Sequence, residues 1–185
     1  MARLPYLEKE DLPPGDRDVL SRDIALMRAL AHSPDAARAM SGLGSFIRHR
    51  SRLDPRLREL AILQVGYSEK VAYEWAHHLK IGFEAGVSER DVAALIDETH
   101  GRTSALEPLA RMVLRAAREM TRDLAIGEAT FSYLSDHLGA ELIVDLTVTI
   151  AFYCAVVRVL ATLEIDLEAD YQEILKRYPL RGGTR

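Results

Sequence analysis

Apolar residues recur at intervals of three and four along almost the whole chain, the spacing typical of amphipathic helices. Val19, Leu20, Ile24, Met27 and Leu30 show it near the N-terminus. The β-like run at residues 146–150 falls within a longer helical period and is therefore not taken as a strand. We predict helices at about residues 17–31, 34–50, 54–67, 70–85, 89–99, 105–122, 127–137, 139–163 and 168–177.

Capping residues separate these predicted helices. Ser33-Pro34 and Asp54-Pro55 each provide an N-cap followed by proline at the first helical position. Gly86 ends one helix and Ser88 begins the next. With no repeat or linker visible, we predict an all-α single domain at residues 17–178, an extended leader at 1–16 and a flexible tail at 179–185.

Composition excludes several classes of protein. The 185 residues are 48% hydrophobic and carry a net charge of −4 without a basic stripe, so we expect no nucleic-acid binding. Asp145 and Arg158 interrupt the longest apolar stretch, residues 142–163, and we expect no membrane span. The N-terminus lacks a signal-like apolar segment, which favours a cytoplasmic protein. Cys154 is the single cysteine, so no internal disulfide can form, and we interpret it as an inert packing residue.

One predicted helix face carries groups suited to catalysis. Val71, Glu74, Trp75 and His78 follow the i, i+3, i+4, i+7 spacing, so Glu74 and His78 stand one turn apart. A carboxylate and an imidazole on a partly apolar face are costly unless they are paired or used. We expect the preceding helix to return antiparallel and to bring Glu59 within a few ångströms of both.

The motif Glu59-Leu60, then Tyr73-Glu74-Trp75-x-x-His78, then Ala85-Gly86-Val87-Ser88, resembles the carboxymuconolactone decarboxylase family. The likeness extends to Leu12-Pro13-Pro14 and to the segment from Tyr153 to Leu163. It implies the helical fold that this family shares with alkylhydroperoxidase D proteins. It also implies a homo-oligomer, a trimer or a hexamer built from trimers. Because one chain cannot easily cover the wide apolar arc of residues 142–163, we expect the helix at 139–163 to contribute to an interface.

The chain departs from the alkylhydroperoxidase branch of this resemblance. In that branch a Cys-x-x-Cys pair lies between the glutamate and the histidine, whereas here Val71 and Glu74 occupy those positions. Thiol peroxidase chemistry needs a thiolate and a resolving thiol. An antioxidant activity of that type is therefore disfavoured.

The resemblance implies loss of carbon dioxide from a small unsaturated carboxylic acid or lactone, without a cofactor or a metal. His78 would transfer the proton, and Glu59 and Glu74 would set its tautomer and basicity. Apolar walls from Trp75, Val71 and Ile62 would exclude water. Arg158, if it faces inward, would hold a substrate carboxylate.

Structural interpretations of the same residues remain open. Glu59 and His78 could be a buried pair that only joins two helices. Trp75 could belong to the core, Tyr73 and His77 to a subunit contact or the surface, and Arg158 to an intersubunit salt bridge. Glu74-x-x-His77 has the spacing of di-iron helix bundles, but those sites need a second such pair, and Asp97-x-x-His100 lies at a predicted helix end. The third functional alternative is a ligand-binding oligomer without activity.

Overall fold

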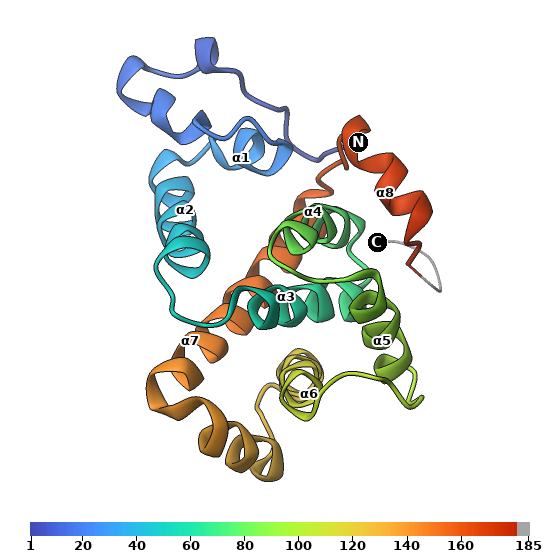
Figure 1. Ribbon diagram of the computed structural model, residues 1–185. Coiled ribbons are helices and arrows are strands. Elements are labelled where there is room, and N and C mark those ends of the chain that lie inside the picture. Colours follow the sequence, from blue (N-terminus) through green and yellow to red (C-terminus); the bar gives the residue numbers. More distant parts are fainter. Residues whose placement is uncertain (181–185) are drawn as a thin grey trace.

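The computed structural model describes residues 1–180, and over that range its regular structure is helical throughout (Figure 1). The predicted all-α fold class is thereby confirmed. The long helices are α2 (Pro34–His49), α3 (Pro55–Glu69), α4 (Ala72–Glu84), α5 (Glu89–Thr99), α6 (Pro108–Asp123) and α7 (Glu128–Leu163). The short ones are η1 (Lys9–Asp11), η2 (Pro14–Leu20), α1 (Ala25–Leu30), η3 (Ala169–Tyr171) and α8 (Gln172–Arg177).

Helix α3 lies at the centre of the bundle, with α4, α6 and α7 packed around it (Figure 1). Every residue from 57 to 67 is buried, including the polar side chains of Arg58, Glu59 and Gln64. A helix that is covered on all sides must satisfy such groups inside the protein. The environment of Glu59 is therefore set by its neighbours and not by solvent.

A tight turn joins α3 to α4. The Asp54 carboxylate caps α3 by accepting a hydrogen bond from the Leu57 amide at 2.9 Å, and Lys70 ends the helix with a left-handed backbone (φ 57°). Next to this turn the helices approach closely, since a Cβ atom at Gly66 would lie 3.3 Å from the Trp75 amide nitrogen. The antiparallel return brings Glu59, two turns further back, across from His78.

Residues 12–49 form a segment that we call the N-terminal cap, whose Ala25 and Ile47 side chains belong to the main core. It has a separate apolar cluster, to which Leu20, Met27 and Ala37 belong, and Figure 1 shows it standing beside the main bundle. The predicted continuous helix at 17–31 is wrong. Residues 14–20 form a 3-10 helix, and Ile24 is extended (φ −126°, ψ 151°) before α1 begins. The leader, too, is only partly extended, because η1 and the start of η2 lie within it.

Helix α7 is two helices separated by a kink. Gly139 has φ 74° and ψ 169°, which matches the predicted break between residues 137 and 139. By length and composition alone, α7 is the one helix among residues 1–180 that could cross a membrane. Half of its most apolar window is buried inside the fold, as expected for a core helix. Its apolar character is thus explained in part by packing on α3 and α6.

The segment after α7 folds back onto α4. The indole Nε1 of Trp75 donates a hydrogen bond of 2.7 Å to the Tyr178 carbonyl oxygen, and α8 packs on α4. Leu180 is buried, so the beginning of the predicted flexible tail belongs to the core. The rest of that predicted tail, residues 181–185, lies outside the described residues.

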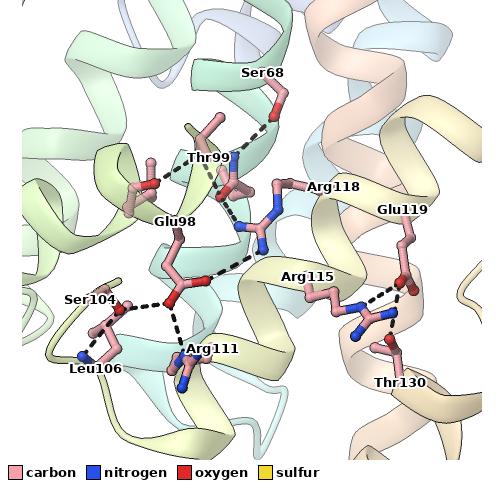
Figure 2. A network of polar contacts seen from close by, with 12 residues as sticks. Ser68, Glu98, Thr99, Ser104, Leu106, Arg111, Arg115, Arg118, Glu119 and Thr130 are labelled. Carbon is pink, nitrogen blue, oxygen red and sulfur yellow. Dashed lines mark hydrogen bonds and ion pairs between the residues drawn. The ribbon is translucent and has the colours of Figure 1, made fainter. Parts of the chain in front are cut away.

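A polar network on the other side of α3 joins this helix to α5 and α6 (Figure 2). The Gln64 amide donates to Ser68 and Thr99, each at 3.0 Å, and accepts from Arg118 at 3.0 Å. Glu98 pairs with Arg111 at 2.8 Å. Because the charged groups in this network have partners within it, we interpret the network as structural.

Candidate active site

His78 stands between two buried carboxylates. Its Nδ1 atom lies 2.7 Å from Glu59 Oε2 on α3, and its Nε2 atom lies 3.1 Å from Glu74 Oε1, one turn earlier on α4. The side chains of Glu59 and Glu74 are 0% and 4% exposed. The structure therefore brings the three predicted residues together as the helical spacing and the antiparallel return required.

The two carboxylates differ in how well they are satisfied. Glu59 accepts a second hydrogen bond, of 3.0 Å, from Arg58 Nε. Glu74 Oε1 is buried and makes no well-formed hydrogen bond within residues 1–180, despite its closeness to the imidazole. A buried oxygen without a good partner is costly, and such groups often mark sites where a ligand binds. Glu74 is thus the less satisfied carboxylate of the array and Glu59 the better anchored one.

The protonation states of the three groups follow from this arrangement. Burial alone would raise the pKa of Glu59, but His78 and Arg58 together hold it below its ordinary value. Burial alone would lower the pKa of His78, but Glu74 and Glu59 outweigh it and raise the pKa. Burial raises the pKa of Glu74, and the negative charge of Glu59 adds to this effect. These directions favour an ionised Glu59 and a charged imidazole at His78, whose Nε2 atom lies 3.1 Å from Glu74 Oε1.

A cavity of about 70 Å³ opens beside Glu74 and His78, between the N-terminal cap and helices α4 and α7. Glu59 does not line it, because the imidazole ring stands in between. Apolar cap residues, among them Ile24, Met27 and Leu30, form the facing wall. The volume is about half of the ~150 Å³ of an engineered cavity that binds benzene. A substrate with one ring would therefore not fit wholly inside it.

Tyr153 on α7 also belongs to the candidate site. The sequence had indicated it only as part of the segment that resembles the family, without a role. It lines the cavity, and its ring stands edge-on to His78 with 4.8 Å between ring centroids. Its hydroxyl makes no hydrogen bond to another described residue. Burial raises its pKa, and the charges of Glu74 and Glu59 raise it further, so the hydroxyl stays protonated and can donate to a ligand.

Four predicted substrate contacts do not line this cavity. Trp75 and Ile62 are 0% exposed within the core, and the Trp75 indole points instead to Tyr178. Val71 borders a different depression, near the end of α7. Arg158 is exposed and donates a hydrogen bond to the Cys154 carbonyl oxygen on its own helix. Their placement in the predicted pocket is therefore wrong, and the expectation that Arg158 clamps a substrate carboxylate here is corrected.

Tyr73 and His77 are buried in the monomer and do not lie on an outer face. His77 stacks between Tyr73 and Tyr171, with ring centroids 4.1 and 3.7 Å away. Glu168 accepts hydrogen bonds from His77 Nε2 at 2.8 Å, from the Tyr73 hydroxyl at 3.0 Å and from the Ala25 amide at 2.8 Å. This joint fixes the C-terminal segment and the start of α1 to α4, directly behind the cavity wall.

Two arginines of the cap also line the cavity, Arg22 before α1 and Arg48 near the end of α2. The sequence offered no signal for either, because only the docking of the cap on the bundle brings them to the site. The di-iron spacing of Glu74 and His77 has no counterpart in the fold. Within the described part of the chain, no group of three or more His, Cys, Asp or Glu side chains is arranged so that it could hold a metal ion.

Comparison with known proteins agrees with this fold. The model of the carboxymuconolactone decarboxylase family matches residues 34–119, a segment that contains Glu59, Glu74 and His78. The resemblance to this family that the motif indicated is thus confirmed over these residues. No curated protein matches the chain.

Solved structures show the same architecture at low sequence identity. A peroxidase-related protein with an alkylhydroperoxidase AhpD core, from Ralstonia eutropha, is 20% identical with a TM-score of 0.76, covering 92% of this chain and 94% of its own. A variant of the debrominase Bmp8, in complex with 2,3,4-tribromopyrrole, is 17% identical with a TM-score of 0.78. The match covers 96% of this chain and 100% of the debrominase chain. A protein of unknown function from Agrobacterium tumefaciens, described as a putative antioxidant defence protein AhpD, is 21% identical with a TM-score of 0.67. The match covers 76% of this chain and 95% of the other chain. The fold is thus AhpD-like.

Proposed function

We propose that this protein is a cofactor-free lyase or isomerase that acts on a small unsaturated carboxylic acid or lactone through Glu74 and His78. The observation that carries the proposal is the His78 ring, anchored on one side by Glu59 and facing an unsatisfied Glu74 oxygen and a cavity on the other. A purely structural pair would need neither the second carboxylate nor the cavity.

The reaction that this arrangement suits is decarboxylation followed by protonation of carbon. The bond from carbon to the departing carboxylate breaks, and its electron pair moves into the conjugated carbonyl to give a dienolate. Tyr153 donates a hydrogen bond to the enolate oxygen, and the proton held between His78 and Glu74 goes to carbon. Solvent then returns one proton to the pair. In an isomerase, the same pair would remove a proton from one carbon of the substrate and return a proton to another, without loss of carbon dioxide.

The alternative functions have less support. Antioxidant chemistry of the alkylhydroperoxidase type is disfavoured because Val71 and Glu74 stand at the positions of its two thiols. Cys154 cannot replace them, since it lies on α7 with its sulfur 3.6 Å from the Thr121 hydroxyl and is buried. A ligand-binding oligomer without activity would keep the cavity but would have no need for a transferable proton.

We also infer a homo-oligomer, a trimer or a hexamer, that uses α7. Val144 on this helix is 58% exposed, and Ala151 and Ala155 on the same side are exposed as well. The apolar window of α7 is only half covered by its own chain. A second copy that packs on this face would cover the rest.

Steady-state kinetics with carboxymuconolactone and related unsaturated lactone acids tests the proposed function. We expect His78→Ala to lower kcat by about 10²–10⁴-fold, the usual contribution of general acid–base catalysis. Glu59→Gln acts on the same proton through the imidazole, so the double variant should be clearly non-additive. Arg158→Ala is the matched control, because Arg158 is exposed and does not line the cavity. Full activity of His78→Ala would assign the array to structure.

A further inference from the structure

Arg22 and Arg48 differ from most arginines of this chain because no carboxylate neutralises them. Neither makes an ion pair with another residue in the described range, and Arg48 donates only a long hydrogen bond, of 3.3 Å, to the Gly44 carbonyl oxygen. By contrast, Arg38 on the same cap pairs with Asp16, Asp18 and Asp35. On the cap, Arg28 and Arg38 thus have counter-ions, whereas Arg22 and Arg48 at the cavity, like Arg17 and Arg50 away from it, have none among the described residues.

The charges around the cavity add up to a positive field. Arg22, Arg48 and the charged His78 all line it, and Glu74 is its one carboxylate. Burial lowers the pKa of His77, which is also in the lining and therefore stays neutral near pH 7. Glu59 lies behind the imidazole and is already paired with Arg58. An anion that enters the cavity thus gains more attraction from the arginines than repulsion from Glu74.

We propose that Arg22 and Arg48 form a carboxylate subsite that selects anionic substrates and places their reacting carbon at Glu74 and His78. The planar guanidinium fork matches a carboxylate with two parallel hydrogen bonds, and an arginine without a counter-ion, such as the half-buried Arg48 or the exposed Arg22, gains from such a ligand. The inference rests on the proposed function only for the position of the reacting carbon. Arg22 and Arg48 thus hold the substrate carboxylate, the role that the sequence had suggested for Arg158.

The subsite also restricts which group of the substrate reacts. Pairing with arginine stabilises a carboxylate as an anion and so opposes its loss as carbon dioxide. The carboxylate held by Arg22 and Arg48 is therefore the one that the product retains. The reacting group lies further into the cavity, against the apolar cap residues and Glu74.

Binding of maleate tests the subsite without any need for turnover. Calorimetry on the full-length protein should show saturable binding of the maleate dianion and none of dimethyl maleate, which has a similar shape without charge. Arg22→Gln and Arg48→Gln should each weaken maleate binding about tenfold, the loss expected for one charge-assisted contact. Arg48→Lys keeps the charge without the fork and should fall in between. Arg50→Gln is the matched control, because the Arg50 guanidinium lies over the Phe46 ring at the end of the same helical region and does not line the cavity.

Two results would overturn the subsite: unchanged maleate binding in both glutamine variants, or equal binding of dimethyl maleate. Arg22 makes no side-chain hydrogen bond that the glutamine variant could lose, so Arg22→Gln should fold, which circular dichroism verifies. Once a substrate is known, Arg48→Gln should raise its KM by a larger factor than it lowers kcat. Maleate binding without turnover of any lactone acid would refute the proposed function and leave the subsite standing. Turnover of uncharged lactones alone would refute the carboxylate subsite and leave the proposed function standing.

Discussion

His78 on α4 is held by Glu59 on α3 through a contact of 2.7 Å between Nδ1 and Oε2, although 19 residues separate them in the chain. Glu59 is fully buried and ionised, so it can only accept, and the imidazole must donate. The contact therefore fixes both the orientation of the ring and the proton on Nδ1. It leaves Nε2 as the atom that faces Glu74 and the cavity.

We predict that His78 titrates above pH 6.5 and that its neighbour His77 titrates below it. Burial lowers the pKa of both, but two carboxylates outweigh that effect only at His78. Titration of the ¹⁵N imidazole shifts measures both residues in one experiment. Glu59→Gln should lower the pKa of His78 and leave that of His77 almost unchanged.

The same shift predicts a pH dependence of stability. Because the pKa of His78 is raised on folding, its contribution to stability is complete below pH 6.5 and disappears as pH rises through the folded-state value. Urea denaturation at increasing pH should show a fall in the free energy of unfolding of the wild-type protein and a smaller fall for Glu59→Gln. Identical pH profiles for the two proteins would contradict the assigned charge on His78.

We predict that acid releases the joint behind the cavity wall. The pKa of Glu168 would rise on burial, but hydrogen bonds from His77 and the Ala25 amide lower it to about 2, below the ordinary 4.5. The unfolded state therefore binds more protons in this interval, and stability falls as pH drops from 4.5 towards 2. Glu168→Gln should flatten this part of the curve. Glu164→Gln, which affects only an exposed pair with Arg3, should not.

Local sequence was sufficient for the bundle and for the Glu59, Glu74 and His78 array. The helical period sets the spacing of Glu74 and His78, and the few residues between α3 and α4 force an antiparallel return. Local sequence could not predict which residues line the cavity, because the residues of one helical face can contact different neighbouring segments. Trp75 is only about 100° around the helix from Glu74, yet it faces the C-terminal segment. Arg22 and Arg48 reach the site only through tertiary docking of the cap, which no local pattern encodes.

We predict a trimeric or hexameric mass by light scattering at micromolar concentration. Val144→Glu, on the exposed face of α7, should shift this mass towards the monomer, because it places a charge in an interface that must exclude water. Leu124 is 88% exposed and lies outside α7, so Leu124→Gln should leave the mass unchanged. A monomer in wild type would contradict this assembly.

We expect no peroxide consumption coupled to a dithiol reductant. No second cysteine exists to resolve an oxidised Cys154, and its neighbour Thr121 is not a base. Cys154→Ser should therefore retain every activity of the wild-type protein. Peroxide turnover that disappears in Cys154→Ser would reverse this assignment.

Transfer of a solvent proton to substrate carbon is the central claim, and it can be measured directly. Muconolactone incubated in D₂O with the protein should gain deuterium at the carbon next to its conjugated system, as followed by proton NMR. Glu74→Gln keeps the size of the side chain but cannot share a proton, and it should slow incorporation by about 10²-fold or more. Arg158→Ala should match wild type. Incorporation at wild-type rate in Glu74→Gln and in His78→Ala alike would contradict the account.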